Sequence, residues 1–121
     1  MFAIVNEQVA KFGKKELFSW FVLISIKPEI LSAAGMPAPE EMKRLDDIET
    51  KILHGLLSES NLCYFGHVTG QNRRDIMLYM PSEQLAKTSV EKQVKLHFPK
   101  GNANYELVND PTWANVGGLI K

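Results

Sequence analysis

Two strand-like runs joined by a short polar connection constrain the fold of this chain most. Leu62–Thr69 and Arg74–Met80 are rich in aromatic and aliphatic residues, and the connection between them is Gly70-Gln71-Asn72-Arg73. A short connection with Gly and Asn between two such runs is typical of a β-hairpin. Gly66, inside the first run, indicates a bulge or close packing. The sequence therefore predicts a hairpin over Asn61–Met80.

An amphipathic helix is predicted on each side of this hairpin. Pro39 suits a first helical turn, and from Met42 to Leu57 apolar residues recur every three or four positions, as they do on one face of a helix. Ser82 has the position of an N-cap for a second helix, whose apolar stripe runs to Phe98. Each helix thus has one apolar face to bury against a sheet.

Three further strands complete the predicted order of elements. Phe2–Val9 alternates loosely, Leu17–Ile26 is apolar on both faces as in a central strand, and Tyr105–Val108 is short. The order is β, β, α, β, β, α, β. Without the first strand it is the ferredoxin-like order. We therefore predict one α+β domain over 1–121, a ferredoxin-like two-layer sandwich: a mainly antiparallel sheet, two helices on one face and an extra N-terminal strand.

The C-terminal part of the chain contains a turn signal and a tryptophan. Asp110-Pro111 starts a turn, and Trp113 is expected to pack against the sheet. Trp20, inside the predicted central strand, is expected to be a second anchor of the core. Gly117-Gly118 is predicted to leave the end of the chain loose.

Composition narrows the class of protein. Lys and Arg together number 14, as do Asp and Glu, which argues against nucleic-acid binding through a general basic field. The apolar run Phe18–Ile26 is too short for a membrane span, which needs about 20 residues. The single cysteine, Cys63, excludes an internal disulfide and a cysteine metal cluster. Together with the missing signal-peptide pattern, it favours the reducing cytoplasm.

No catalytic or metal motif is present in the sequence. His54, His67 and His97 lack a spacing suited to one metal ion, and there is neither a serine elbow nor a glycine-rich phosphate loop. We therefore predict no catalytic residue, no metal and no cofactor. The enzyme alternative would need scattered residues near the hairpin, of which His67, Asp75 and Tyr79 are the candidates.

Two groups of charged residues are candidates for a protein interface. The first predicted helix carries more acids than bases, and a basic partner such as a nuclease would be attracted to it. The hairpin turn carries two adjacent arginines, which suit an anion or a carboxylate. The alternatives are a solvated helix face and arginines that pair with nearby acids. The candidate interface residues are Glu40, Glu41, Asp46, Asp47, Arg73 and Arg74.

Three short motifs resemble a known family. They are Gly35-Met36-Pro37 with Glu40-Glu41, Tyr64-x-Gly66-x-Val68-Thr69 with Arg73-Arg74-Asp75, and Asn109-Asp110-Pro111-x-Trp113. Over roughly Trp20 to Trp113 the chain resembles an uncharacterised bacterial family, the domain of unknown function numbered 695. That family has no assigned activity. It is similar in fold to the regulator of ribonuclease E activity, type B, which inhibits a nuclease by binding it.

The resulting hypothesis is a non-enzymatic bacterial protein that binds another protein. It would be an inhibitor or regulator, with a nuclease or a toxin as its partner, the latter in a toxin-immunity role. The alternatives are a small enzyme with an unrecognised site near the hairpin and a self-associating domain. As a homodimer, such a domain would pair through a sheet edge or an open apolar sheet face.

Overall fold

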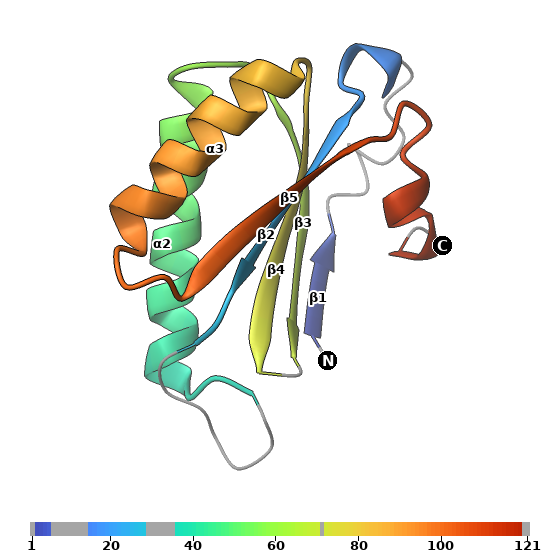
Figure 1. Ribbon diagram of the computed structural model, residues 1–121. Coiled ribbons are helices and arrows are strands. Elements are labelled where there is room, and N and C mark those ends of the chain that lie inside the picture. The colour runs from blue at the N-terminus through green and yellow to red at the C-terminus, as the bar shows by residue number, and fades with distance from the viewer. Residues whose placement is uncertain (1, 6–14, 29–35, 71, 120–121) are drawn as a thin grey trace.

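The strands form one five-stranded antiparallel sheet, with both long helices on one face (Figure 1). The computed structural model describes residues 2–5, 15–28, 36–70 and 72–119, without the side chains of 2–5 and 117–119. The strands are β1 (Phe2–Val5), β2 (Trp20–Ile26), β3 (Cys63–Gly70), β4 (Arg73–Met80) and β5 (Ala103–Asn109). The helices are α2 (Pro39–Leu57) and α3 (Glu83–His97), with short 3-10 helices η1 (Lys15–Leu17) and η2 (Ala114–Leu119).

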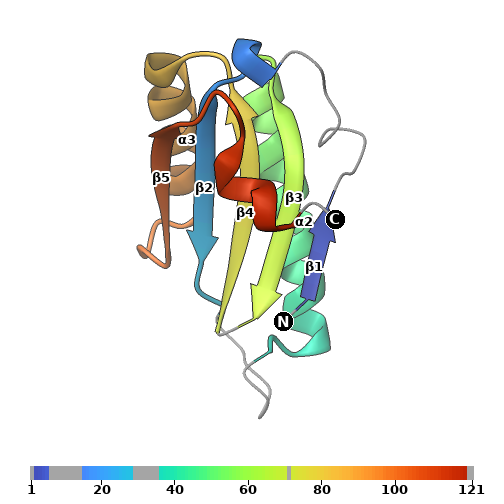
Figure 2. The same ribbon diagram turned by 90° about the vertical axis from the view of Figure 1, so that its right-hand side faces the viewer.

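The strand order confirms the predicted fold class. The sheet runs β1-β3-β4-β2-β5, and without β1 it has the order of a ferredoxin-like sandwich. The extra strand β1 pairs with β3 at the edge farthest from β5 (Figure 2). The predicted first strand continued to residue 9, but residues 6–9 lie outside the described part of the chain.

Both helices begin where local signals place them. Pro39 occupies the first turn of α2, where a missing backbone N–H costs nothing. The side chain of Ser82 accepts a hydrogen bond from the backbone N–H of Leu85, which confirms the predicted N-cap of α3. The apolar stripe of α2 faces the sheet, where Leu45, Ile52 and others are buried.

Three local predictions need correction. The strand expected from Leu17 begins at Trp20, because residues 15–17 form η1. The hairpin turn is tighter than predicted, since Gly70 pairs with Arg73. The end of the chain is not loose as far as Leu119, because residues 114–119 form η2.

Two apolar layers hold the sheet, one on each face. Under the helices, fully buried Val22, Ile24, Leu78 and their neighbours pack against α2 and α3. On the opposite face, Trp113 and Val116 pack against Phe21, Phe65, Met77 and Tyr79. Figure 2 shows η2 lying across this face. Residues of η2 therefore cover the apolar cluster around Trp113 on this face, whereas Val108, opposite Phe21, is 40% exposed.

Trp113 is the centre of the second layer, as predicted. Its ring stacks on Tyr79 with centroids 4.2 Å apart, and its Nε1–H donates to the carbonyl oxygen of Phe18 at 2.9 Å. Tyr79 donates its hydroxyl hydrogen to Asp110 at 2.7 Å. The prediction for Trp20 is wrong: it stands at the beginning of β2, is only partly buried and belongs to neither core layer.

Candidate functional site

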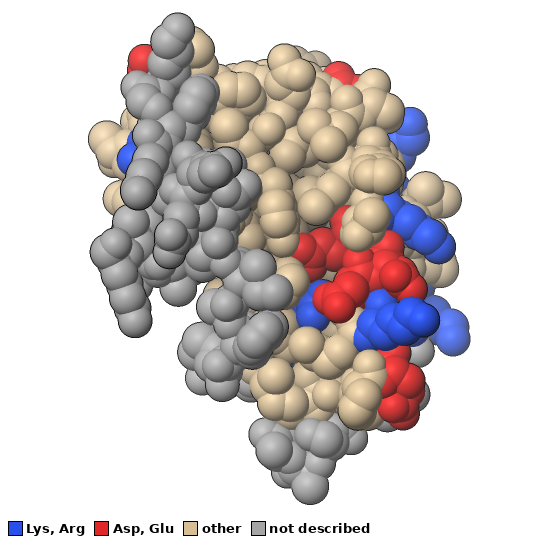
Figure 3. All heavy atoms as spheres, turned by 180° about the vertical axis from the view of Figure 1, so that it is seen from behind, with Lys and Arg blue, Asp and Glu red and all other residues tan. Residues whose placement is uncertain are grey.

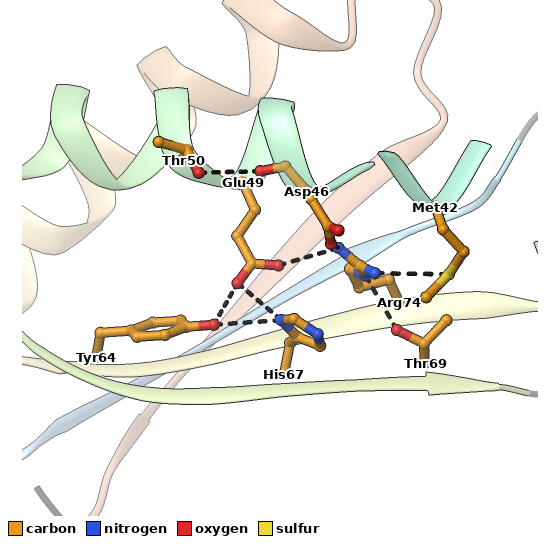
Figure 4. A network of polar contacts seen from close by, with 8 residues as sticks. All are labelled: Met42, Asp46, Glu49, Thr50, Tyr64, His67, Thr69 and Arg74. Carbon is orange, nitrogen blue, oxygen red and sulfur yellow. Dashed lines mark hydrogen bonds and ion pairs between the residues drawn. The ribbon is translucent and has the colours of Figure 1, made fainter. Parts of the chain in front are cut away.

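A bulge in β3 brings two polar side chains under α2. The register of β3 against β4 shifts between Tyr64 and Gly66, and Gly66 has φ 152°, a backbone conformation that favours glycine. Residues three apart, Tyr64 and His67, therefore point to the same side of the sheet, which a regular strand would not allow. The bulge predicted at Gly66 is thus confirmed, and its consequence is a polar cluster between α2 and the sheet (Figure 4).

Glu49 of α2 is the acceptor of this cluster. Only 5% of Glu49 is exposed, and its Oε2 accepts a hydrogen bond from the hydroxyl of Tyr64. The same oxygen lies 2.8 Å from Nδ1 of His67. Because a carboxylate only accepts hydrogen bonds, Nδ1 carries the proton. Burial and the bond to Glu49 both raise the pKa of Tyr64, so this hydroxyl stays protonated and remains a donor.

Arg74 of β4 connects the sheet to α2. Its side chain is fully buried, and its Nη1 donates to Asp46 at 2.6 Å and to Glu49 at 3.4 Å. Its Nε donates to the hydroxyl of Thr69 at 3.0 Å, and its Nη2 lies 3.7 Å from the sulfur of Met42. The guanidinium thus spans both layers, and its charge is compensated by two carboxylates of one helix.

His67 leaves one nitrogen unused. Its Nε2 is buried and has no hydrogen-bond partner among the residues that the structure describes. A histidine with a carboxylate on Nδ1 and a free Nε2 is oriented as a proton acceptor. This nitrogen is enclosed, and both His67 and the carboxylate that orients it are buried.

The described residues contain no group of three or more His, Cys, Asp or Glu side chains able to hold a metal ion. Within the same part of the chain, no helix is both long and apolar enough to cross a membrane. Cys63 is a free, partly buried cysteine, and burial raises the pKa of its thiol. A higher thiol pKa means less thiolate, which makes this sulfur a poor nucleophile.

Comparison with known families gives a match over nearly the whole chain. The model of a family of unknown function, DUF695, matches residues 2–115. The chain belongs to the DUF695 family. No curated protein and no solved structure matches it. The expected resemblance to this family is therefore confirmed.

The predicted interface residues of this DUF695 protein fall into two groups. Glu40, Asp47 and Arg73 are exposed, and the side chain of Asp46 is 59% exposed although it is bonded to Arg74. The placement of Glu41 and Arg74 on an accessible surface is wrong. Arg74 is fully buried, and Glu41 is 1% exposed.

The two buried residues have structural partners that explain their burial. Glu41 accepts hydrogen bonds from the Nε and Nη2 groups of Arg44, one turn along α2. Arg74 lies in the polar cluster described above. Arg73, by contrast, pairs with Asp75 at 3.1 Å, as the alternative interpretation of the hairpin arginines predicted.

The three residues named for a scattered site near the hairpin do not meet. His67 faces α2, whereas Asp75 and Tyr79 lie on the opposite face of the sheet, where Asp75 accepts from Ser25 at 2.9 Å and Tyr79 contacts Trp113. The sheet therefore separates the three side chains proposed for an active site.

Sequence reasoning missed the residues that meet Arg74 and His67 in the DUF695 structure. Glu49 has a detectable signal, because it occupies the same helical face as Leu45, Ile52 and Leu56, where a carboxylate needs a buried partner. Tyr64 and His67 have no comparable signal, since the bulge decides that they share a face.

Proposed function

We propose that this protein acts by binding another protein, as an inhibitor or regulator, through the N-terminal half of α2. The observation that carries the proposal is a group of exposed carboxylates on that half-helix: Glu40, Asp46 and Asp47. Figure 3 shows acidic side chains gathered in one patch on this side of the molecule, with basic side chains beside it. Such a patch attracts a basic partner and steers its approach.

The anchoring of α2 supports the proposal. Asp46 is more than half exposed, yet it accepts a hydrogen bond from the fully buried Arg74. The exposed carboxylate is therefore held on a helix that is tied to the sheet. A surface that is already ordered loses less entropy on binding.

The partner is proposed to be a basic protein, such as a nuclease or a delivered toxin. The regulator role rests on the similarity in fold that we expect between this family and the regulator of ribonuclease E activity, type B. The immunity role would use the same acidic surface. The proposal takes the protein to act in the cytoplasm, where its single cysteine stays reduced.

The enzyme alternative has less support. Nε2 of His67, the proton acceptor that the bond to Glu49 orients, is buried. General acid-base catalysis needs this atom within hydrogen-bond distance of a substrate.

The test is affinity capture from the native host, followed by quantitative binding to the captured protein. We expect the double variant Glu40→Lys and Asp47→Lys to weaken binding by about tenfold or more at low salt, and added salt to weaken the wild-type complex. Asp46 is left intact because it is bonded to Arg74. Glu83→Lys, which reverses one charge at the exposed start of α3, is the control for each of the single variants Glu40→Lys and Asp47→Lys, measured beside the double variant.

Two results would refute the proposal. One is a captured partner whose affinity is changed no more by the α2 double variant than by Glu83→Lys. The other is the absence of any protein enriched over a mock capture.

A further inference from the structure

The outer side of β5 is paired with no strand in the part of the chain that the structure describes. β5 pairs with β2 along its whole length, and it is the last strand of the order. Figures 1 and 2 show it at the border of the sheet, away from β1. No described strand lies beyond it. Edge strands of this kind accept an added strand unless they are blocked.

Two hydrogen bonds that flank β5 show which of its residues turn their main-chain N–H and C=O groups toward β2. Lys27 donates its N–H to the carbonyl of Asn102 at 2.8 Å, and Asp110 donates its N–H to the carbonyl of Ser19. Asn102 and Asp110 thus turn their main-chain groups toward the β2 side. Because main-chain direction alternates in an antiparallel ladder without register shifts, Ala103, Tyr105 and Leu107 present N–H and C=O outward.

A groove of about 560 Å³ runs along this edge on the helix side. Its apolar lining includes Val94 and Phe98 of α3 and Tyr105 of β5, and Glu91 and Lys95 are at its polar part. A strand added to β5 would place every second side chain on this side of the sheet. The groove suits apolar side chains at those positions.

A second hollow, of about 450 Å³, lies on the other face at the same stretch of β5. Gly101, Ala103 and Asn104 line both hollows, so the two meet at the edge. The lining of the second hollow is polar and includes Lys27 and Glu106. The remaining side chains of an added strand would therefore face a polar surface.

The charges around the two hollows give an added strand a direction. Arg73 is paired with Asp75, and Lys95 is paired with Glu91 at 3.3 Å. Lys27 and Glu106 have no ion pair among the described residues.

Lys27 and Glu106 stand at different points along β5. Lys27 stands opposite Asn102, beyond the N-terminal end of the strand, and Glu106 lies farther along it. A complementary strand thus carries an acid near Lys27 and a base near Glu106.

We propose that β5 binds an extended segment of another protein as an added antiparallel strand. The segment carries a basic residue, then apolar residues alternating with a small polar one, then an acidic residue, in that order. The antiparallel direction is the one in which all the described strand pairs of this sheet are arranged. Main-chain hydrogen bonds to Ala103, Tyr105 and Leu107 supply affinity, and the hollows select the side chains.

The probe is the capped peptide Thr-Lys-Val-Thr-Val-Glu-Thr, titrated against the full chain labelled with nitrogen-15. We expect amide shifts concentrated on β5 and on the groove side of α3. N-methylation of the two valines removes the donors that face β5 and should weaken binding by about tenfold. N-methylation of the lysine and glutamate, whose amides face outward, should leave the dissociation constant unchanged.

Charge and direction are tested separately. The reversed peptide Thr-Glu-Val-Thr-Val-Lys-Thr has the same composition and should bind several-fold more weakly. Glu106→Lys should weaken the first peptide by about threefold or more, and Glu83→Lys should not. The α2 double variant should leave peptide binding unchanged, so failure of the α2 proposal is distinguishable from failure of this one.

Three results would overturn the inference. The first is a peptide titration without shifts on β5. The second is equal tolerance of both N-methylated peptides. The third is a dimer in sedimentation analysis with β5 protected from amide exchange, because a second copy of this chain would then occupy the edge.

Discussion

Replacing Arg74 with alanine should be far more destabilising than replacing its neighbour Arg73. The side chain of Arg74 is fully buried, where it is bonded to Asp46, Glu49 and Thr69. Its removal leaves the carboxylate of Glu49 buried without a cation, and breaking a buried pair in this way costs about 3–5 kcal/mol. Against a total stability of roughly 5–15 kcal/mol, this is a large fraction.

Arg73→Ala is the matched control. The side chain of Arg73 is 58% exposed and pairs with Asp75 at the surface. Exposed pairs contribute about 0.2–1 kcal/mol. Both variants lose the same side chain from adjacent positions of one strand, so the difference between them measures burial and pairing.

The assay is urea unfolding followed by tryptophan fluorescence, with both transitions checked for two-state behaviour. A double-mutant cycle adds Glu49→Gln, which removes the buried charge but keeps its shape. In that background, Arg74→Ala should cost about 1–3 kcal/mol less than in the wild type. Equal losses of stability in Arg73→Ala and Arg74→Ala, or a cycle without coupling, would refute the reasoning.

Three further predictions concern other buried contacts. Tyr64→Phe removes the donor to the buried carboxylate of Glu49 and should lower the free energy of unfolding by about 1–3 kcal/mol. The control Tyr105→Phe should lower it by less than about 0.5 kcal/mol, because the Tyr105 hydroxyl has no hydrogen bond among the described residues. Gly55→Ala forces the flexible end of the Gln93 side chain, whose amide lies 2.4 Å from the added Cβ, to move. It should therefore gain less stability than the same change in a Gln93→Ala background, where we expect up to about 1 kcal/mol in equilibrium unfolding. For Asp110, burial raises the pKa, but hydrogen bonds from two backbone N–H groups and from a tyrosine hydroxyl outweigh it and hold the pKa below the ordinary 3.8. Its stabilising effect is therefore present above that pH and lost below it, so Asp110→Asn should flatten the acid limb of a stability–pH curve.

Local signals were sufficient for the elements of the fold. Three signals depend only on residues close together in the chain: the first turn at Pro39, the N-cap at Ser82 and the glycine at the β3 bulge. Because all the interacting groups are neighbours in sequence, these features can be predicted from the sequence alone. Boundaries were less accurate where a neighbouring strand decides them. β5 extends over Ala103–Asn109 rather than Tyr105–Val108, because β2 pairs with all of it.

The candidate surfaces were only partly predictable. Asp47 is exposed as its helical position indicated. Arg74 was expected beside Arg73 on one charged turn, but the pleat of β4 sends consecutive side chains to opposite faces, and α2 covers one of those faces. An interface prediction from charge clusters therefore fails where adjacent residues belong to a strand.

By itself, the sequence determined the order of the elements, their amphipathic faces and the family. These depend on periodicity, caps and short motifs, which are properties of contiguous residues. Tertiary structure alone decided that Glu49, His67 and Arg74 meet, and that β5 is the last of the described strands at its edge of the sheet. Contacts between α2, β3 and β4 join residues far apart in the chain, and a one-residue bulge changes which side chains take part.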